Sequence, residues 1–299
     1  MSVARTVFLT TLAMIAFAGN SLLCRMALKH TGIDAASFTT IRLISGALIL
    51  GLVVRWHHRA RVRTGGGNWP SAFALFAYAA GFSFAYVDLS AATGALLLFG
   101  AVQATMIGYG VWHGERLLRL QLVGFVLALA GLVGLMLPGL AAPPLYSALL
   151  MLGAGAAWGI YSLRGKGAGD PTAVTAGNFL RTIPITAALS LLMVNNISLD
   201  PAGIGYAVLS GALASGIGYA IWYQALPALK ATQAATVQLS VPVLAALGGI
   251  VFLMEPVGWR MVLASIAILG GIALVILEKK LPHDAPQVGS ADRPQTDRH

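Results

Sequence analysis

Charged residues are scarce in this chain of 299 residues, and cysteine is almost absent. Only 10% of the residues are charged and 58% are hydrophobic, whereas about 25% of the residues in a typical soluble domain are charged. Cys24 is the single cysteine, so the chain can form no disulfide within itself and no zinc cluster built on cysteines. The composition therefore excludes an ordinary soluble domain, and the lone thiol adds no functional prediction.

Long apolar runs fill the sequence instead. They measure about 19 to 24 residues each, which is the length that a helix needs to cross about 30 Å of hydrocarbon. Ten runs are present, or nine if the short breaks near Asp88 or Lys230 do not separate two spans. The predicted spans are residues 5–28, 37–56, 69–87, 90–112, 117–137, 145–163, 172–194, 203–225, 232–254 and 259–278. The sequence therefore predicts an all-α integral membrane protein with about ten transmembrane helices.

Basic residues are distributed unevenly between the two predicted sides of the membrane. Fourteen lysines and arginines lie on one side, and only Lys29 and Arg260 lie in the opposite loops. Loops rich in lysine and arginine stay on the cytoplasmic side of a membrane. We therefore expect a multi-pass protein of the bacterial inner membrane with both termini in the cytoplasm. The formal net charge of +9 then reflects topology rather than a nucleic-acid partner.

Polar landmarks of the first half recur in the second half at an almost constant offset. Arg25 is matched by Arg164, and Glu115 by Glu255, at offsets that differ by a single position. Each of these glutamates is followed at the same distance by a glycine in the next predicted span, at positions 131 and 271. Internal similarity of this kind indicates a structural repeat.

Five spans in each repeat force the second repeat to cross the membrane in the opposite direction. Such inverted repeats allow two mirror-related conformations, with a binding site near the midplane where the halves meet. We therefore predict a first repeat over residues 1–140, a second repeat over residues 141–281 and a disordered cytoplasmic tail over residues 282–299.

Two segments resemble a known family of membrane carriers. Ala225–Trp259, with the sequence ALPALKATQAATVQLSVPVLAALGGIVFLMEPVGW, is similar to the second EamA-type repeat of the drug/metabolite transporter (DMT) superfamily. Leu89–Leu117, with the sequence LSAATGALLLFGAVQATMIGYGVWHGERL, resembles the same motif more weakly, because Gln103 and Met106 stand near the place of Pro242. The resemblance covers nearly the whole chain and is strongest toward the YddG-type exporters of amino acids, aromatic ones included.

The resemblance implies a ten-helix exporter fold. In that fold, helices 1–4 and 6–9 enclose a central cavity, and helices 5 and 10 lie at the periphery. The function that it implies is export of small metabolites, most of all amino acids, by alternating access through that cavity.

Charged residues within or beside the spans form two predicted clusters. A charge at the centre of a transmembrane helix costs about 2.5–3.5 kcal/mol on insertion scales, so these groups need partners or water. We predict that each glutamate faces the arginine pair of the other repeat and that the two clusters are ion-pair latches of alternate states. Permanent ion pairs or arginines that reach lipid headgroups are the alternative. The outer cluster is Arg25, Arg42 and Glu255, and the inner cluster is Arg164, Arg181 and Glu115.

Aromatic and amide side chains at membrane depth are the candidates for a substrate site. Several of the aromatic residues are three or four positions apart and share a helix face, and an amide without a partner is costly in hydrocarbon. For each aromatic residue alone, helix packing or a place at the membrane interface is the alternative. The predicted cavity residues are Asn20, Tyr78, Phe82, Trp158, Tyr161, Tyr219, Tyr223 and Gln238.

Other residues are assigned mechanical roles. Pro184 and Pro242 each remove a backbone hydrogen bond within a span and are predicted hinges. Tryptophans near span ends are predicted interface anchors, namely Trp56, Trp69, Trp112 and Trp259.

No aspartate or glutamate falls in the middle third of any predicted span, where ion-coupled carriers commonly hold a carboxylate. We therefore expect facilitated diffusion of a small-molecule substrate, with no metal or organic cofactor and with membrane lipid as the other partner. Because one chain contains both repeats, a monomer is sufficient.

Three other functions are weighed against this one. A drug or nucleotide-sugar carrier of the same superfamily, with or without proton coupling, is the main alternative. A channel would need a continuous polar path. An enzyme is not expected, because every histidine lies in a loop, at a span end or in the tail, so the spans contain no catalytic set.

Overall fold

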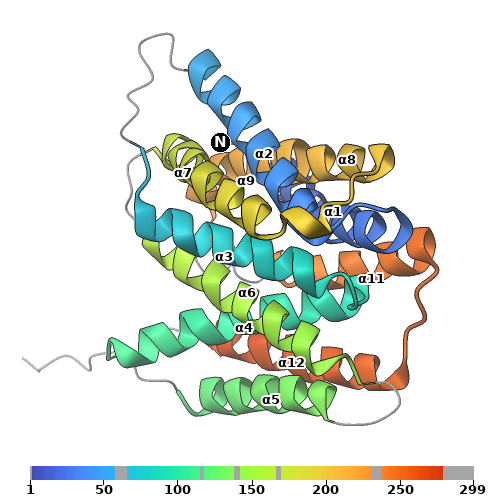
Figure 1. The fold of residues 1–299 in the computed structure, drawn as a ribbon. Coiled ribbons are helices and arrows are strands. Elements are labelled where there is room, and N and C mark those ends of the chain that lie inside the picture. The colour runs from blue at the N-terminus through green and yellow to red at the C-terminus, as the bar shows by residue number, and fades with distance from the viewer. Residues whose placement is uncertain are drawn as a thin grey trace, which may run out of the picture.

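The computed structural model describes residues 2–57, 66–114, 118–137, 142–165, 170–229 and 237–278. These residues fold into one bundle of helices and contain no β-strand (Figure 1). The predicted tail and Glu115 lie outside the described residues. The fold is that of an all-α integral membrane protein, which confirms the prediction made from the apolar runs.

Each predicted span corresponds to one helical unit of the structure. The first half contains α1 (Val3–His30), α2 (Ala35–His57), α3 (Trp69–Ala85), α4 (Ala91–Trp112) and α5 (Arg119–Met136). The second half begins with α6 (Leu145–Gly165) and α7 (Pro171–Leu192) and ends with α11 (Ser240–Leu253) and α12 (Trp259–Glu278). Between them, α8 (Pro201–Val208), the π-helix η2 (Leu209–Ile217) and α9 (Gly218–Ala225) form one continuous unit. Short 3₁₀ turns are η1 (Val194–Asn196) and η3 (Leu226–Ala228).

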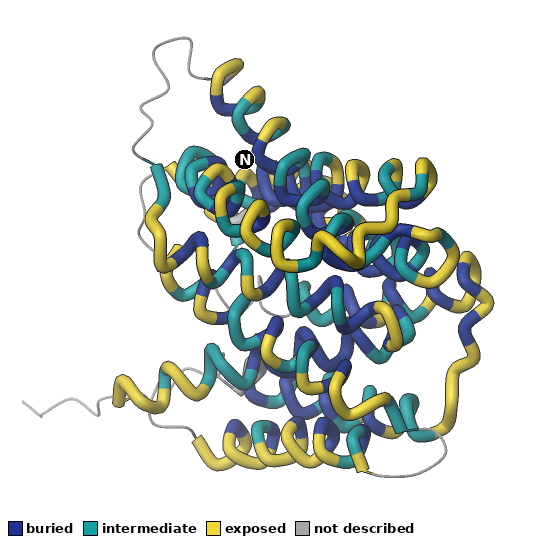
Figure 2. The backbone as a smooth tube through the Cα atoms, in the orientation of Figure 1, coloured by how far each residue is buried: buried dark blue, intermediate teal, exposed yellow. Residues whose placement is uncertain are grey.

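The outside of the bundle is apolar. Six helical units of the described residues are long and apolar enough to cross a membrane, and α11 and α12 contribute shorter apolar stretches. On α5, the side chains of Val123, Val126 and Val133 are more than half exposed. Exposed positions follow the outer sides of the helices, while buried positions lie between them (Figure 2). An apolar surface of this extent is stable against lipid rather than water.

Polar caps fix where several helices begin. The side chain of Asn68 accepts a hydrogen bond from the backbone N–H of Ser71 at the start of α3, and Ser90 caps α4 in the same way. Asp170 and Asp200 cap α7 and α8, and each directly precedes a proline. A proline suits the first turn of a helix because it leaves no unpaired N–H there. The polar segments between the apolar runs therefore supply the capping residues at which these helices begin.

The two halves pack on each other in a reciprocal pattern. α3 and α4 pack against α6, while the α8–η2–α9 unit and α11 pack against α1. The second set of contacts repeats the first with the halves exchanged. The α8–η2–α9 unit takes the place of α3, α11 takes the place of α4, and α1 takes the place of α6. α2 packs against α7, and α5 packs against α12 at one edge of the bundle (Figure 1). Each of these two pairs joins a helix to its own counterpart.

Glycines allow the close approach of α5 and α12. A Cβ atom added at Gly131 would lie 2.8 Å from a side-chain atom of Ile268, so this contact needs glycine. Gly271, the counterpart of Gly131 in the second half, lies against Ala128, which is the counterpart of Ile268 at the same offset. Small residues at such contacts let helix backbones meet closely. The contact of α6 with α4 also depends on glycine, because a Cβ atom at Gly155 would crowd α4.

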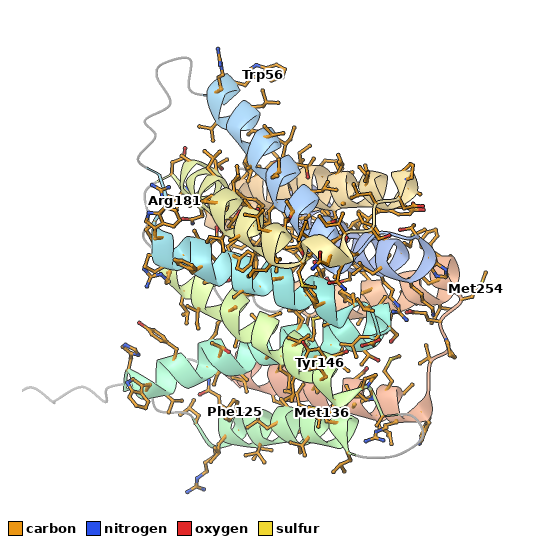
Figure 3. The ribbon with its side chains drawn as sticks, viewed as in Figure 1. Trp56, Phe125, Met136, Tyr146, Arg181 and Met254 are labelled. Atoms are coloured by element: carbon orange, nitrogen blue, oxygen red, sulfur yellow. The ribbon has the colours of Figure 1, made fainter. Side chains whose placement is uncertain are left out.

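The turns gather at two ends of the bundle. We call the end with residues 31–34, 86–90, 193–200 and 254–258 the Asp34 end, and the end with residues 66–68, 113–114, 165 and 226–229 the Arg164 end. The predicted anchors Trp56, Trp69, Trp112 and Trp259 lie at helix ends, and each is at least half exposed. Figure 3 shows Trp56 at the tip of α2 and Met254 at the opposite end of the bundle.

The two predicted hinge prolines lie at different positions in their helices. Residues 237–238 are helical, but the helix is interrupted at Leu239, three residues before Pro242, and α11 starts at Ser240. Pro242 therefore lies in the first turn of α11, where its missing N–H removes little. Pro184 lies inside α7 with its ring exposed on the outside of the bundle.

Candidate functional site

Aromatic rings from three helices meet in the interior of the bundle. Trp158 of α6 is central, because its ring centroid lies 4.8 Å from that of Tyr78 on α3 and 5.1 Å from that of Tyr219 on α9. Tyr161 and Phe82 extend the cluster, at 5.4 Å from Trp158 and from Tyr78 respectively. The structure thus brings five of the predicted cavity residues into one set that spans both halves of the chain.

A chain of hydrogen bonds runs beside these rings. The hydroxyl of Tyr78 accepts from Nδ2 of Asn20 at 3.3 Å and from Nη2 of Arg42 at 3.0 Å. The hydroxyl of Ser210 donates to Oδ1 of Asn20 at 2.6 Å. All four side chains are buried. The predicted amide Asn20 therefore links α1 to α3 and η2 at the level of the rings, and Arg42 adds α2 through the Tyr78 hydroxyl.

The structure also places residues at this site that the sequence did not single out. Phe17 of α1 packs edge-on against Tyr219 and Trp222, and Phe179 of α7 packs edge-on against Tyr219. Ser210 belongs to the π-helix, a structure that is frequent at functional sites. The run LSGALASGI of small residues is the one sequence signal for this segment.

At the Asp34 end, Arg25 and Glu255 form a buried ion pair. Nε of Arg25 donates to Oε1 of Glu255 at 2.9 Å, and Nη1 donates to the backbone oxygens of Tyr86 and Val87. The backbone N–H of Ala91 donates to Oε2 of Glu255 at 2.8 Å, so the carboxylate also caps α4. A carboxylate is favourable at the positive end of a helix. Both oxygens of Glu255 are thus engaged.

The backbone at Met254 directs Glu255 toward these partners. Met254 has φ 51° and ψ 34°, which is the left-handed conformation that side chains other than glycine rarely adopt. The turn lets the N–H of Glu255 bond to the oxygen of Gly249 at 3.0 Å. The local strain is therefore tied to the ion pair.

Arg42 departs from the predicted outer cluster. Its guanidinium lies 4.8 Å from the ring centre of Phe82 and 5.3 Å from that of Tyr78, and the ion pair of Glu255 is formed with Arg25 instead. The prediction that Glu255 faces both Arg25 and Arg42 is wrong in this structure. The physical reason is that the second oxygen of Glu255 is held by the start of α4.

At the Arg164 end, the predicted arginines bind neutral groups. Arg164 donates to the hydroxyl of Ser71 at 3.1 Å and to Oδ1 of Asn68 at 3.3 Å. Arg181 donates to the backbone oxygens of Gly66 and Gly177 at 2.7 and 2.9 Å. Glu115, their predicted partner, lies outside the described residues.

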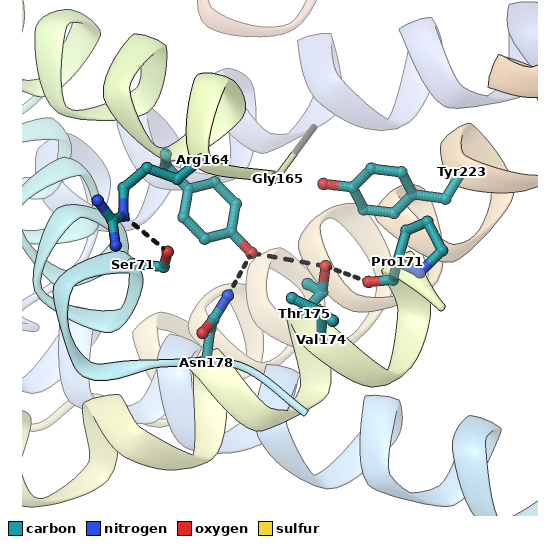
Figure 4. Close-up of a pocket in the computed structure, with 9 residues that line it drawn as sticks. Ser71, Arg164, Gly165, Pro171, Val174, Thr175, Asn178 and Tyr223 are labelled. Atoms are coloured by element: carbon teal, nitrogen blue, oxygen red, sulfur yellow. Dashed lines mark hydrogen bonds between the residues drawn. The ribbon is translucent and has the colours of Figure 1, made fainter. Parts of the chain in front are cut away.

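A pocket opens among these residues at the Arg164 end. Its interior has room for about one water molecule, and it is lined by α3, α6, α7 and α9. Tyr161 and Tyr223 both line it, and Figure 4 shows Tyr223 on the side opposite Arg164 and Ser71. The hydroxyl of Tyr161 accepts from Asn178 at 3.4 Å and bonds to Thr175 at 3.5 Å. Because Tyr161 also packs against Trp158, the pocket lies next to the aromatic cluster.

Gln238 is half-buried in the short helical segment just before α11. The other seven predicted cavity residues belong to the ring cluster, the Asn20 chain or the pocket, and Gln238 is not among the described residues that line them.

Comparisons with known proteins agree with this fold. Residues 145–277 match the model of the EamA-like transporter family. The uncharacterized protein PA1977 of Pseudomonas aeruginosa is 58% identical over 97% of this chain and 98% of its own length. The threonine/homoserine exporter RhtA of Salmonella typhimurium is 36% identical over 42% of this chain and 43% of its own. A solved crystal structure shares the fold at a TM-score of 0.65 and 18% identity, covering 93% of this chain and 99% of that one.

Proposed function

This chain belongs to the EamA-like transporter family of the drug/metabolite transporter superfamily, and from that premise we propose that it exports amino acids, aromatic ones included, by facilitated diffusion. The observation that carries the proposal is the set of rings around Trp158 with the buried polar chain of Tyr78 and Asn20 beside it. Ligand sites for small molecules are mostly apolar with a few placed polar groups. The name of the relative RhtA supports amino acids as the substrate class.

Alternating access is proposed to use two inverted repeats. The reciprocal packing of α6 on α3 and α4, and of α1 on the α8–η2–α9 unit and α11, supports this arrangement. The matched contacts of Gly131 and Gly271 support it at the level of residues. Two halves that pack on each other in this way can exchange roles around a central site.

The Arg164 end is proposed to face the cytoplasm of the bacterial inner membrane, because nearly all basic loop residues belong to that side. The pocket at that end would then be the entrance for substrate, while the ion pair of Arg25 and Glu255 closes the opposite end. In this structure the rings touch one another, so substrate entry requires that they separate. Export from the cytoplasm fits this geometry.

The proposal also covers ion coupling and the oligomeric state. The ring cluster and the Asn20 chain contain no carboxylate among the described residues, which supports passive transport without a coupling ion or a cofactor. A single chain supplies residues from both halves to the site, so a monomer suffices. Transport without chemical conversion of the substrate is the proposed activity, rather than an enzymatic one.

Uptake of labelled amino acids into proteoliposomes tests the function. We expect saturable uptake of aromatic and other amino acids that does not change with an imposed pH, sodium or voltage gradient. Absence of uptake for every amino acid in the panel would refute the substrate class. Uptake that requires a gradient would refute the passive mechanism alone.

A further inference from the structure

Arg42 is a buried cation with incomplete partners. Its side chain is 1% exposed, and Nη2 donates to the hydroxyl of Tyr78. Nε and Nη1 have no hydrogen-bond partner among the residues that the structure describes. A buried donor without a partner is costly, and the cost is larger when the group is charged. A packed interior retains such an unpaired charged group when the group has a functional role.

Neighbouring acids of the described chain do not supply that partner. Glu255, the acid predicted for Arg42, uses one oxygen for Arg25 and the other for Ala91. Among the described residues, the hydrogen bond of the Arg42 guanidinium goes to the Tyr78 hydroxyl, and the ion pair of Glu255 goes to Arg25. Arg25 shows the contrast, since it has one carboxylate and two carbonyl oxygens.

The guanidinium is also held in a defined place. It lies over the rings of Phe82 and Tyr78, at 4.8 and 5.3 Å from their centres. Arg42 lies two turns into α2, about 10 Å from the Asp34 end. It therefore sits on the closed side of the ring cluster, opposite the pocket. A substrate bound among the rings would therefore have one of its ends next to the guanidinium of Arg42.

We propose that Arg42 is the group that binds the carboxylate of the substrate. The planar guanidinium forms paired, charge-assisted hydrogen bonds with a carboxylate, and the free N–H groups are the donors that remain for it. The apolar part of the substrate then packs on Trp158 and Tyr219. This inference rests on the proposed function and narrows it to substrates with a free carboxylate.

Competition with analogues of one substrate tests this role. In proteoliposomes with labelled phenylalanine, we compare inhibition by unlabelled phenylalanine, phenylalaninamide and phenylethylamine, the last two of which lack the carboxylate. Wild-type protein should prefer phenylalanine by roughly 10- to 100-fold. Arg42→Gln should lose this preference, and Arg42→Lys should keep part of it, because it retains the charge without the planar fork.

Arg181→Gln is the matched control, because Arg181 occupies in the second half the position that Arg42 occupies in the first. Unlike Arg42, Arg181 donates hydrogen bonds to two backbone oxygens. It should keep the preference of the wild type. Size-exclusion profiles in detergent verify that each variant is folded. If Arg42→Gln does not fold, the wild-type preference and the Arg42→Lys variant decide the question.

The experiment distinguishes failure of the Arg42 proposal from failure of the proposed function. If phenylalanine is transported but phenylalaninamide competes equally in the wild type, or if Arg42→Gln keeps the preference, Arg42 does not bind the carboxylate and the proposed function stands. If no amino acid is transported by the wild type, both proposals are overturned.

Discussion

Arg25 and Glu255 lie 230 residues apart in the chain and form an ion pair of 2.9 Å that joins the two halves at the Asp34 end. Both side chains are buried, with 7% and 6% of their surfaces exposed. Removing one partner of a buried pair leaves an unpaired charge, which is strongly destabilising for the state that contains it. We therefore expect the pair to stabilise the conformation that this structure shows.

Glu255→Gln should open the Asp34 end more often. The single cysteine, Cys24, is buried next to Arg25 and reports the opening without an engineered probe. We expect a membrane-impermeant maleimide, applied from the side of the Asp34 end, to label Cys24 several-fold faster in this variant than in the wild type. Lys29→Gln, which removes an exposed charge from the same end, is the control and should leave the labelling rate unchanged. Equal rates for Glu255→Gln and the wild type would show that the pair is not a latch.

Trp158→Ala should weaken transport of aromatic substrates. Its ring contacts Tyr78, Tyr161 and Tyr219, and aromatic pairs add about 0.5–1.5 kcal/mol each beyond the area that they bury. We expect the KM for phenylalanine uptake to rise roughly tenfold or more. Trp112→Ala provides the comparison, because Trp112 is 88% exposed at a helix end. If the KM changes equally in both variants, Trp158 does not contact the substrate.

Gly211→Ala should destabilise the fold. An added Cβ at Gly211 would clash with the backbone oxygen of Arg42, so α2 and η2 would have to move apart. Crowding of this kind costs about 1–3 kcal/mol. Thermal unfolding in detergent should show a lower midpoint than in the wild type. Gly205→Ala, on the same helical unit with nothing within 4 Å of the new Cβ, should unfold at or above the wild-type temperature.

Asp34 should make the stability of the protein depend on pH. Burial alone would raise the pKa of Asp34, but hydrogen bonds from the side chain of Ser37 and from the backbone N–H groups of Ser198, Ser37 and Ala36 lower it overall. A lowered pKa means that the folded state favours the carboxylate, so this stabilisation is present above the ordinary pKa of aspartate and is lost as the pH falls through the folded value.

Asp34→Asn is the variant that checks this dependence. It should be less stable than the wild type at neutral pH, and the gap should narrow as the pH falls through the folded pKa of Asp34. Thermal unfolding in detergent across this range is the measurement. A gap that stays constant with pH would mean that the charge of Asp34 is not what matters.

The sequence predicts the helices well because span length is dictated by membrane thickness. It also predicts which aromatic residues lie at a common depth, and Tyr78, Trp158 and Tyr219 do meet. Depth does not specify which helices are neighbours. For that reason the sequence predicts that Arg25 and Arg42 share Glu255, whereas the start of α4 competes for its second oxygen. The choice between the two arginines depends on tertiary packing.

The π-helix is beyond prediction for a different reason. The residues of η2 are small or apolar, so they are equally compatible with a regular helix. The extra residue per turn is stabilised only in the assembled bundle, where Gly211 meets α2 and Ser210 bonds to Asn20.

The contact between α5 and α12 has a consequence for how substitutions act at this edge of the bundle. Because Gly131 lies on Ile268 and Gly271 lies on Ala128, the same face serves as both partners of the interface. A face that fits its own counterpart is self-complementary. This edge of the bundle therefore rests on two matched contacts rather than one. A substitution at Gly131 would crowd one of them and leave the contact of Gly271 with Ala128 in place.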